Sequence, residues 1–389
     1  MEEKYIRAKA PCKYYGKCGG CQLQHLTNDS QNLYKQNYIN RLMSGFGKVN
    51  DLIFMEEPYE YRNKMHISFG YGPKGKLIAG MYEINSHRII DIDQCMIQDP
   101  IGYEIVKTIK QIMKKYKMEP YDEDTGQGFL RHVLIKSGYK TGEVMVVLVV
   151  SDRMFHGSNN FVKILRKKHP QIETVILNVN DKDTSMILGD YEKTIYGKGF
   201  IVDELCGINF RISAKSFYQV NPKQAEVLYE KALEMAEFKG DERIIDAYCG
   251  IGTITLAASK YVKEAIGVEL NSDAMRDAIK NKKYNDIKNV EFINDDAGSF
   301  MEYMASKNEK FDAVIMDPPR SGSDEVFLSS LLRLEPEKII YISCNPETQK
   351  RDLDFLTKQG YLVKKIQPVD MFPQTDHVEC IALLQREIM

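Results

Sequence analysis

The chain has 389 residues, of which 43% are hydrophobic and 28% are charged, and its formal net charge at pH 7 is −2. This length and composition predict a folded protein of two or three domains and exclude a globally disordered chain. The small net charge does not point to a nucleic-acid binder, but it does not exclude one, because a basic patch can occupy one face of a neutral protein.

The N-terminus and the apolar runs predict where the protein works. Two acidic residues and a lysine follow Met1, without the apolar segment of a secretory signal. The longest strongly apolar run, residues 144–150, is far too short to span a bilayer. We therefore expect a cytoplasmic protein without a membrane or obligate protein partner, and a monomer by default. In a reducing compartment, its eight cysteines predict metal binding, catalysis or packing rather than disulfides.

Residues 1–27 are rich in cysteine and glycine and predict a small, loop-rich module. Cys12, Cys18 and Cys21 have C-x5-C-x2-C spacing, and Cys95 could supply a distant fourth ligand. Four thiolates suit a zinc ion or an iron–sulfur cluster, and spacing alone does not choose between them. The C-x3-C-x2-C spacing of radical enzymes is absent, which disfavours cluster-driven radical chemistry.

The middle of the chain predicts a helical linker and then an α+β domain. The linker is residues 28–55, with helical periodicity from about 29 to 45, and we expect it to pack on the C-terminal domain. The α+β domain is residues 56–212. Its predicted elements are hairpins of 65–71 with 77–83 and of 133–137 with 143–150, and helices near 100–117 and 159–169.

Residues 213–389 predict a Rossmann-like α/β domain, because helices and strands alternate along them. The helices are expected at 222–238, 253–260 and 273–284, and the strands at 243–247, 264–269, 290–293, 313–316 and 338–342. Such alternation is typical of a parallel sheet with helices on both faces.

Two glycines, Gly250 and Gly252, follow the first strand of this domain. Glycines at the carboxyl end of a strand let the backbone approach a ligand closely. No third glycine follows, which disfavours a pyrophosphate ligand, and the pair alone fits a plain tight turn equally well. Tyr248 and Thr253, beside these glycines, are candidate cofactor contacts.

Acidic residues follow the next strands in order. Glu269 is placed to accept hydrogen bonds from ribose hydroxyls, and Asp296 from an adenine amino group. Asp317 begins a loop that two prolines stiffen. Each acid alone would fit a helix cap or a surface position. Together they fit an adenosine ligand without phosphates, and we predict S-adenosylmethionine.

Cys344 follows the strand at 338–342, at the sheet edge where ligands bind. An isolated cysteine is usually a packing residue, but the neighbouring Ser343, Asn345 and Pro346 favour catalysis. A thiolate that adds to carbon 6 of uracil makes carbon 5 nucleophilic enough to take a methyl group from a sulfonium, and a base must then remove the proton at carbon 5.

Two residues near the C-terminus are candidates for that base. Glu379 is preferred, although it could instead be a surface residue on an edge strand, and His377 is the second candidate.

Five motifs together resemble the uridine-5 RNA methyltransferases, which include bacterial 23S ribosomal RNA and transfer RNA enzymes. The matching segments are residues 217–221, 246–252, 317–320, 343–346 and 370–379. The resemblance implies that Gln219 contacts the cofactor and that Asp317, with support from Arg320, orients the uracil. It also implies that Cys344 is the nucleophile and Glu379 the base.

The same resemblance extends to the cysteines. Family members with this cysteine spacing, and with a later cysteine in a segment similar to residues 91–95, carry a [4Fe–4S] cluster, which implies one on Cys12, Cys18, Cys21 and Cys95. We expect its role to be structural or RNA-contacting, because methylation needs no electrons. Residues 61–64 also resemble part of the family's RNA-binding domain. RNA is the expected partner, with 23S ribosomal RNA favoured because the ribosomal enzymes carry these cysteines and transfer RNA as the alternative.

Two features depart from the family, and two rival functions remain open. Gln374 stands where some members carry histidine, and no β-barrel domain of the kind that begins some ribosomal RNA enzymes precedes Cys12. RNA affinity or target choice is expected to differ accordingly. An exocyclic-amine RNA methyltransferase would use the Asp-Pro-Pro loop without Cys344 or Glu379. A non-catalytic, cluster-containing RNA-binding protein would not need S-adenosylmethionine.

Overall fold

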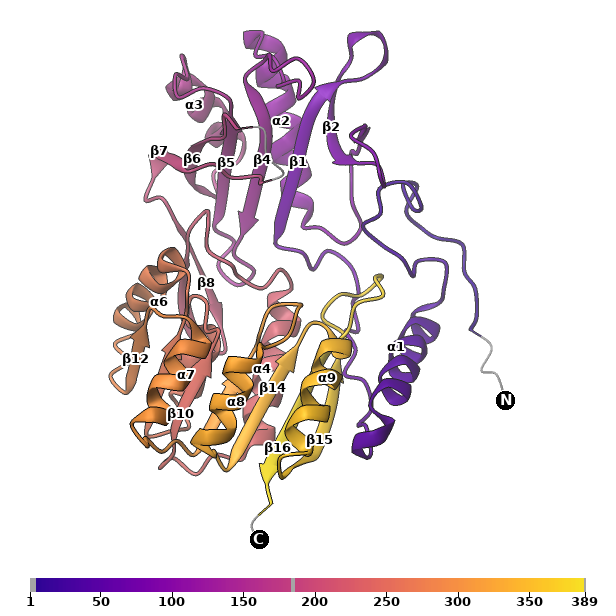
Figure 1. Ribbon diagram of the computed structural model, residues 1–389. Coiled ribbons are helices and arrows are strands. Elements are labelled where there is room, and N and C mark those ends of the chain that lie inside the picture. Colours follow the sequence, from indigo (N-terminus) through magenta and orange to yellow (C-terminus); the bar gives the residue numbers. More distant parts are fainter. Residues whose placement is uncertain (1–4, 183–185, 388–389) are drawn as a thin grey trace.

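The computed structural model describes residues 5–182 and 186–387, which form two seven-stranded sheets and a two-stranded one. The first large sheet has the order β3-β2-β1-β4-β5-β6-β7 and occupies the upper half of Figure 1. Its strands are β1 (Lys64–Tyr71), β2 (Leu77–Tyr82), β3 (Ile89–Asp91), β4 (Leu130–Ser137), β5 (Val144–Val150), β6 (Ile172–Val179) and β7 (Tyr191–Gly197). Both predicted hairpins are confirmed, since β1 pairs with β2 and β4 with β5 in antiparallel register.

The central strands of this first sheet, β4 and β5, are buried on both faces. Helices α2 (Pro100–Tyr116) and α3 (Ser158–Lys168) pack on one face, where alternate side chains such as Val146 and Leu148 join their apolar cluster. The intervening Met145 and Val147 face the other way and belong to a cluster shared with the C-terminal domain. Every residue of β5 is therefore buried, which accounts for its unbroken apolar sequence.

The second large sheet has the Rossmann-like α/β architecture that the sequence predicts. Its order is β12-β11-β10-β13-β14-β16-β15. The strands are β10 (Arg243–Ala247), β11 (Glu264–Val268), β12 (Val290–Ile293), β13 (Ala313–Met316), β14 (Lys338–Ser343), β15 (Tyr361–Val369) and β16 (Glu379–Arg386). The five predicted strands, β10 to β14, run parallel as expected. Strand β16, which was not among the predicted strands, lies between β14 and β15 and runs antiparallel to both.

Helices cover both faces of the second sheet. They are α4 (Pro222–Ala236), α5 (Thr253–Ala258), α6 (Ser272–Tyr284), α7 (Ala297–Ser306), α8 (Glu325–Leu334) and α9 (Pro346–Thr357). Alternate strand residues serve the two faces: Ile244 packs with α4 and α5, whereas Ile245 packs with α7 and α8. In Figure 1, α7, α8 and α9 lie in front of the sheet and α4 lies behind it.

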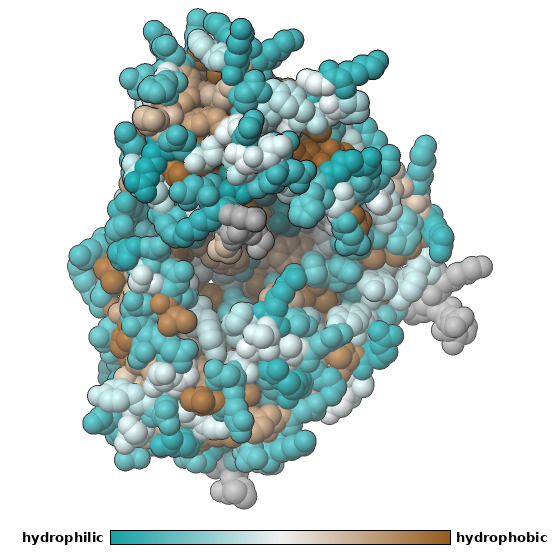
Figure 2. All heavy atoms as spheres, turned by 45° about the horizontal axis from the view of Figure 1, so that its top comes forward, coloured by the Kyte–Doolittle hydropathy of each residue, from teal (hydrophilic) through white to brown (hydrophobic). Residues whose placement is uncertain are grey.

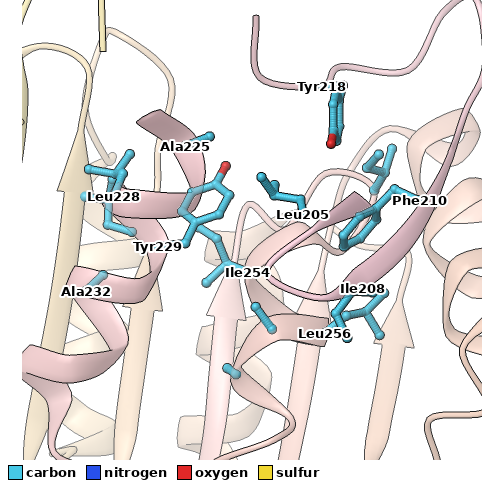
Figure 3. Close-up of a cluster of buried hydrophobic side chains, with 14 of the residues drawn as sticks. Leu205, Ile208, Phe210, Tyr218, Ala225, Leu228, Tyr229, Ala232, Ile254 and Leu256 are labelled. Atoms are coloured by element: carbon cyan, nitrogen blue, oxygen red, sulfur yellow. The ribbon is translucent and has the colours of Figure 1, made fainter. Parts of the chain in front are cut away.

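A β-hairpin closes the core beside α4 and α5. Its strands are β8 (Ile201–Leu205) and β9 (Ile208–Ile212). Figure 3 shows Leu205 of β8 between the side chains of α4, such as Tyr229, and Phe210 of β9. The hairpin, which lies in sequence between the two large sheets, is thus part of the C-terminal core.

Helix α1 (Asn28–Leu42) is shorter than the predicted helix, because a short 3-10 turn, Ser44–Phe46, follows it. Its Ile39, together with Met43, is fully buried and belongs to the apolar cluster that the second sheet forms with helices such as α9. Figure 1 shows α1 beside α9. No helix among the described residues is long and apolar enough to cross a membrane.

Candidate active site

A cavity of about 830 Å³ lies at the carboxyl ends of the parallel strands of the second sheet. All the predicted cofactor and catalytic residues line it: Gln219, Tyr248, Thr253, Glu269, Asp296, Asp317, Arg320, Cys344 and Glu379, together with His377. The parallel strands end at this edge and the antiparallel β16 begins there, which explains how distant segments meet. Figure 2 shows the molecular surface hollowed between the halves built on the two large sheets.

The glycine loop forms one wall of the cavity. Gly250 and Gly252 have φ values of 58° and 84°, a region that favours glycine. A Cβ on Gly252 would lie 2.5 Å from the ring of Phe292, so a larger residue does not fit there. Tyr248 also has a positive φ of 67°, and its hydroxyl lies 3.2 Å from the Ser323 hydroxyl. Such a backbone in a tyrosine is strained and persists because the surrounding structure enforces it.

The two acidic residues after β11 and β12 already have partners from the backbone. Glu269 accepts hydrogen bonds from the amides of Gly250 (3.0 Å) and Asn271 (2.7 Å). Asp296 caps α7 by accepting from the amide of Ser299 at 3.0 Å. Each carboxylate keeps further lone pairs free, and each side chain lines the cavity. Capping and ligand binding are therefore compatible at Asp296.

Strand pairing brings Cys344 and Glu379 together. Ser343 of β14 pairs with Cys380 of β16, which sets the next residue, Cys344, opposite Glu379. The Ser343 hydroxyl accepts from the Asn345 amide at 3.1 Å and so fixes the turn that carries the cysteine. Glu379 is only 3% exposed, whereas Cys344 is half-buried.

Burial and neighbouring charges set the pKa values in this group. Burial, together with the carboxylates of Glu379 and Asp317, raises the pKa of the Cys344 thiol to about 11, and Arg320 acts in the opposite sense. Burial also raises the pKa values of Asp317 and Glu379, and each charge discourages the other's ionisation. The two carboxyl groups therefore tend to share a proton near neutral pH.

Arg320 is the cation of the site, and the N-terminal turn of α9 holds its backbone. Its carbonyl accepts from the Asn345 side-chain amide (2.9 Å) and from the Thr348 hydroxyl (3.2 Å). Its guanidinium lies 3.4 Å from the His377 ring. Burial and Arg320 lower the pKa of His377, so this histidine is neutral at pH 7.

Sequence reasoning did not single out several residues that line the cavity, among them Tyr229, Phe217 and Leu270. Tyr229 of α4 is 2% exposed, and its hydroxyl interacts with Thr253 and Gln219. Phe217 and Leu270 are large apolar residues with exposed fractions of 65% and 69%. Phe217 begins the matching segment 217–221 and Leu270 directly follows Glu269, so position in the motifs was the available signal.

The four predicted cluster cysteines lie in one region, away from this cavity. The thiol of Cys21 interacts electrostatically with those of Cys95, Cys18 and Cys12, and burial raises its pKa to about 12. Backbone amides at Ile97 and Gln98 donate toward the sulfur of Cys95.

A glutamine supports the cysteine region. The side-chain oxygen of Gln24 accepts from the Cys12 amide at 3.3 Å, and the Gln24 side chain also interacts with the Cys21 thiol. Amide donors directed at thiolates are the surroundings that iron–sulfur sites use, so the residues fit such a group.

Among the described residues, the distances between potential metal-ligand atoms differ between the four predicted cysteines and a second group around Cys206. No three of the four predicted sulfurs come within 4.8 Å of one another, whereas donor atoms of Cys206, Glu226 and Glu230 do. Glu226 in the latter group already pairs with Lys140 at 2.8 Å. Cys206 therefore lies beside a satisfied ion pair.

The fold and the cavity define a methyltransferase of the α/β class. Residues 27–387 match the family model of the tRNA (uracil-5-)-methyltransferases, and the chain belongs to this family. It is therefore an RNA-modifying enzyme. An uncharacterized RNA methyltransferase of Halalkalibacterium halodurans is 42% identical over 99% of this chain and 85% of that relative. One from Staphylococcus aureus is 40% identical, over 97% of this chain and 84% of its own length.

A solved structure agrees with this assignment. The tRNA (uracil-54, C5)-methyltransferase of Pyrococcus abyssi, in complex with S-adenosyl-L-homocysteine, superposes with a TM-score of 0.78. It is 29% identical, and the match covers 94% of this chain and 86% of the archaeal one.

Proposed function

We propose that this enzyme transfers a methyl group from S-adenosylmethionine to carbon 5 of a uridine in RNA, with Cys344 as nucleophile and Glu379 as base. The observation that carries the proposal is the pairing of β14 with β16, which sets a half-buried thiol opposite a buried carboxylate. An exocyclic-amine methyltransferase needs neither residue, so their juxtaposition would have no purpose in that reaction.

The methyl donor fits the wall formed by the glycine loop. Glu269 is placed to accept from ribose hydroxyls and Asp296 from an adenine amino group, while Gln219, Tyr248 and Thr253 line the rest of that wall. S-adenosylmethionine supplies an electrophilic methyl group on sulfonium. The S-adenosyl-L-homocysteine complex of the Pyrococcus abyssi enzyme supports this choice of ligand.

The chain's own residues account for the remaining steps. The Cys344 thiolate forms a bond to carbon 6 of the uracil, which Asp317 orients, and the electrons gained at carbon 5 take the methyl group as its bond to sulfonium breaks. The Glu379 carboxylate accepts the proton from carbon 5, the C5–C6 double bond re-forms and the C6–S bond breaks. Arg320 favours the thiolate and supports the Asp317 loop.

We also propose that Cys12, Cys18, Cys21 and Cys95 hold a [4Fe–4S] cluster. The amide donors at Ile97 and Gln98 that face the sulfur of Cys95, together with the family resemblance of the cysteine spacing, support the cluster rather than zinc. We propose 23S ribosomal RNA as the substrate on the family resemblance of these cysteines, with transfer RNA as the alternative.

The test of the proposed function is substitution of the nucleophile. Cys344→Ala should abolish methylation of RNA while S-adenosylmethionine still binds with wild-type affinity, because the adenosine wall is untouched. Cys206→Ala, which changes a free cysteine outside the cavity, controls for loss of a thiol. Methylation by Cys344→Ala at the wild-type rate would exclude covalent catalysis and favour the amine reaction.

A further inference from the structure

The loop that leads to Glu379, residues 370–378, has an unusual conformation at Gln374. This side chain is 1% exposed, and its backbone is left-handed, with φ of 71°. A non-glycine residue keeps such a backbone only where the surrounding structure enforces it. Gln374 stands five residues before Glu379, so whatever enforces its conformation also fixes the approach to the base.

The enforcing contacts come from the N-terminal segment. The carbonyl of Gln374 accepts from the amides of Gln22 (3.1 Å) and Leu23 (3.0 Å). Its side-chain oxygen accepts from Gln31 Nε2 at 3.1 Å, and its own Nε2 donates to Asn28 Oδ1 at 3.2 Å. The residue is thus held through both its main chain and its side chain.

Two buried donors hold the residues before Gln374. Lys35 Nζ of α1 donates to the Asp370 carboxylate at 2.7 Å and to the carbonyl of Phe372 at 3.1 Å. The hydroxyl of Tyr61 donates to the carbonyl of Pro373 at 2.9 Å. The loop therefore depends on partners that lie more than 300 residues away in sequence.

The cysteine segment, residues 12–23, supplies the two main-chain hydrogen bonds to Gln374. Gln22 and Leu23 directly follow Cys21, one of the four proposed ligands. Among the described residues before α1 there is no helix or strand of several residues, only a bridge between Arg7 and Leu26. A segment with so little structure of its own gains order from whatever fixes its cysteines, as in small metal-bound modules.

We propose that Gln374 is a positioning residue that couples the cysteine segment to the general-base loop, so that the metal group on the cysteines helps to keep Glu379 opposite Cys344. The proposal rests on the proposed role of Glu379. It gives the metal group a structural task in catalysis without any transfer of electrons. Loss of the hydrogen bonds between Gln374 and the N-terminal residues should slow removal of the carbon-5 proton while leaving S-adenosylmethionine binding intact.

The first test compares the lifetimes of the covalent RNA adduct. In Gln374→Ala, the adduct with natural uridine should resolve about tenfold more slowly than in the wild-type holoenzyme, because small displacements of a reacting group cost large factors in rate. The Kd for S-adenosylmethionine should not change. Gln374→His, the residue of some relatives, should restore part of the rate.

The matched control changes the same segment without touching the loop. Lys13→Ala removes an exposed ion pair with Asp93 (2.9 Å) and should resolve the adduct at the wild-type rate. Resolution at that rate in Gln374→Ala as well would overturn the role of the Gln374 side chain in positioning Glu379.

The second test measures hydrogen exchange of residues 370–378 by mass spectrometry, independently of activity. These amides should lose protection in Gln374→Ala and in wild-type protein stripped of its metal with a chelator, while α8 keeps its protection. Unchanged exchange in the stripped protein would contradict the coupling alone. Failure of the wild-type enzyme to form any adduct would instead overturn the proposed function.

Discussion

Three charged groups surround the thiol of Cys344. Burial and the carboxylates of Glu379 and Asp317 raise its pKa to about 11, and Arg320 acts in the opposite sense. A thiol with a raised pKa is protonated at neutral pH, so any reaction of the free enzyme's thiolate should accelerate as pH rises toward 11. The pKa values of Asp317 and Glu379 are also raised. The carboxylate form of Glu379, which the proposed reaction needs, therefore also becomes more populated as the pH rises.

Glu379→Gln should lower the pKa of Cys344, because it removes a negative charge next to the thiol. The fraction of thiolate changes tenfold for each unit of pKa. Alkylation of Cys344 by iodoacetamide, followed by mass spectrometry between pH 7 and 10, should therefore be faster in this variant at each pH. Arg320→Gln should shift the profile the other way. Identical profiles for wild type and Glu379→Gln would show that the two groups do not interact.

The same variant should behave differently with RNA. If Glu379 removes the proton at carbon 5, Glu379→Gln should accumulate a methylated protein–RNA adduct that resolves at least a hundredfold more slowly than in wild type, since general-base catalysis contributes about 10²–10⁴. Denaturing gels of timed samples measure this. His377→Ala is the control, because an adduct that accumulates there instead would make His377 the base.

The residues proposed to react could be selected from the sequence because each one ends or begins a strand in a recognisable motif. Cys344 and Glu379 belong to short segments whose polar residues interrupt apolar strands. Tyr229 could not be predicted in the same way, since its ring reaches the cavity from a helix and looks like any buried residue of that helix. The Lys35–Asp370 pair joins residues 335 positions apart, and no local sequence pattern predicts such a contact.

At the scale of elements, α1 is part of the C-terminal core although it precedes the first sheet in sequence. Ile39 and Met43 are fully buried and pack with residues of the second sheet. Ile39→Ala should lower the free energy of unfolding by about 2–5 kcal/mol, because it leaves a cavity in a packed core. Urea unfolding measures this, with Arg41→Ala on the exposed side of α1 as a control within about 1 kcal/mol of wild type. Equal effects of the two substitutions would mean that α1 contributes little to the core.

Strand direction marks the limit of prediction at this scale. Hydrophobic runs located β10 to β14, and the alternation with helices made them parallel. Residues 379–386 are equally apolar, but an apolar run has the same pattern whether the strand is parallel or antiparallel. Only the pairing of β16 with both β14 and β15 reveals its direction and explains how Glu379 reaches the same sheet edge as Cys344.

At the scale of the whole molecule, two separate regions can be tested apart. The cavity contains none of the four cysteines assigned to the cluster. Anaerobically purified wild-type protein should contain about four iron and four sulfide per chain, and Cys95→Ala should contain less of both while still binding S-adenosylmethionine. Metal analysis and calorimetry measure these quantities, with Cys206→Ala as the control. One zinc per chain and no sulfide would contradict the cluster.

The division into an N-terminal module, a linker and two domains stays a prediction, although two separate large sheets agree with its main boundary. The sequence could not show that residues of the N-terminal segment pack on the loop before Glu379. Those contacts run between main-chain groups and buried amides, and they leave no periodic or compositional signal.

The most direct test of uridine-5 methylation is a covalent trap. The protein is mixed with S-adenosylmethionine and with ribosomal or transfer RNA containing 5-fluorouridine, and the mixture is resolved on a denaturing gel. Fluorine at carbon 5 cannot leave as a proton, so wild-type enzyme should give a shifted band that needs both Cys344 and the methyl donor, and sequencing the trapped RNA identifies the uridine. No shifted band with either RNA would contradict methylation through a Cys344 adduct.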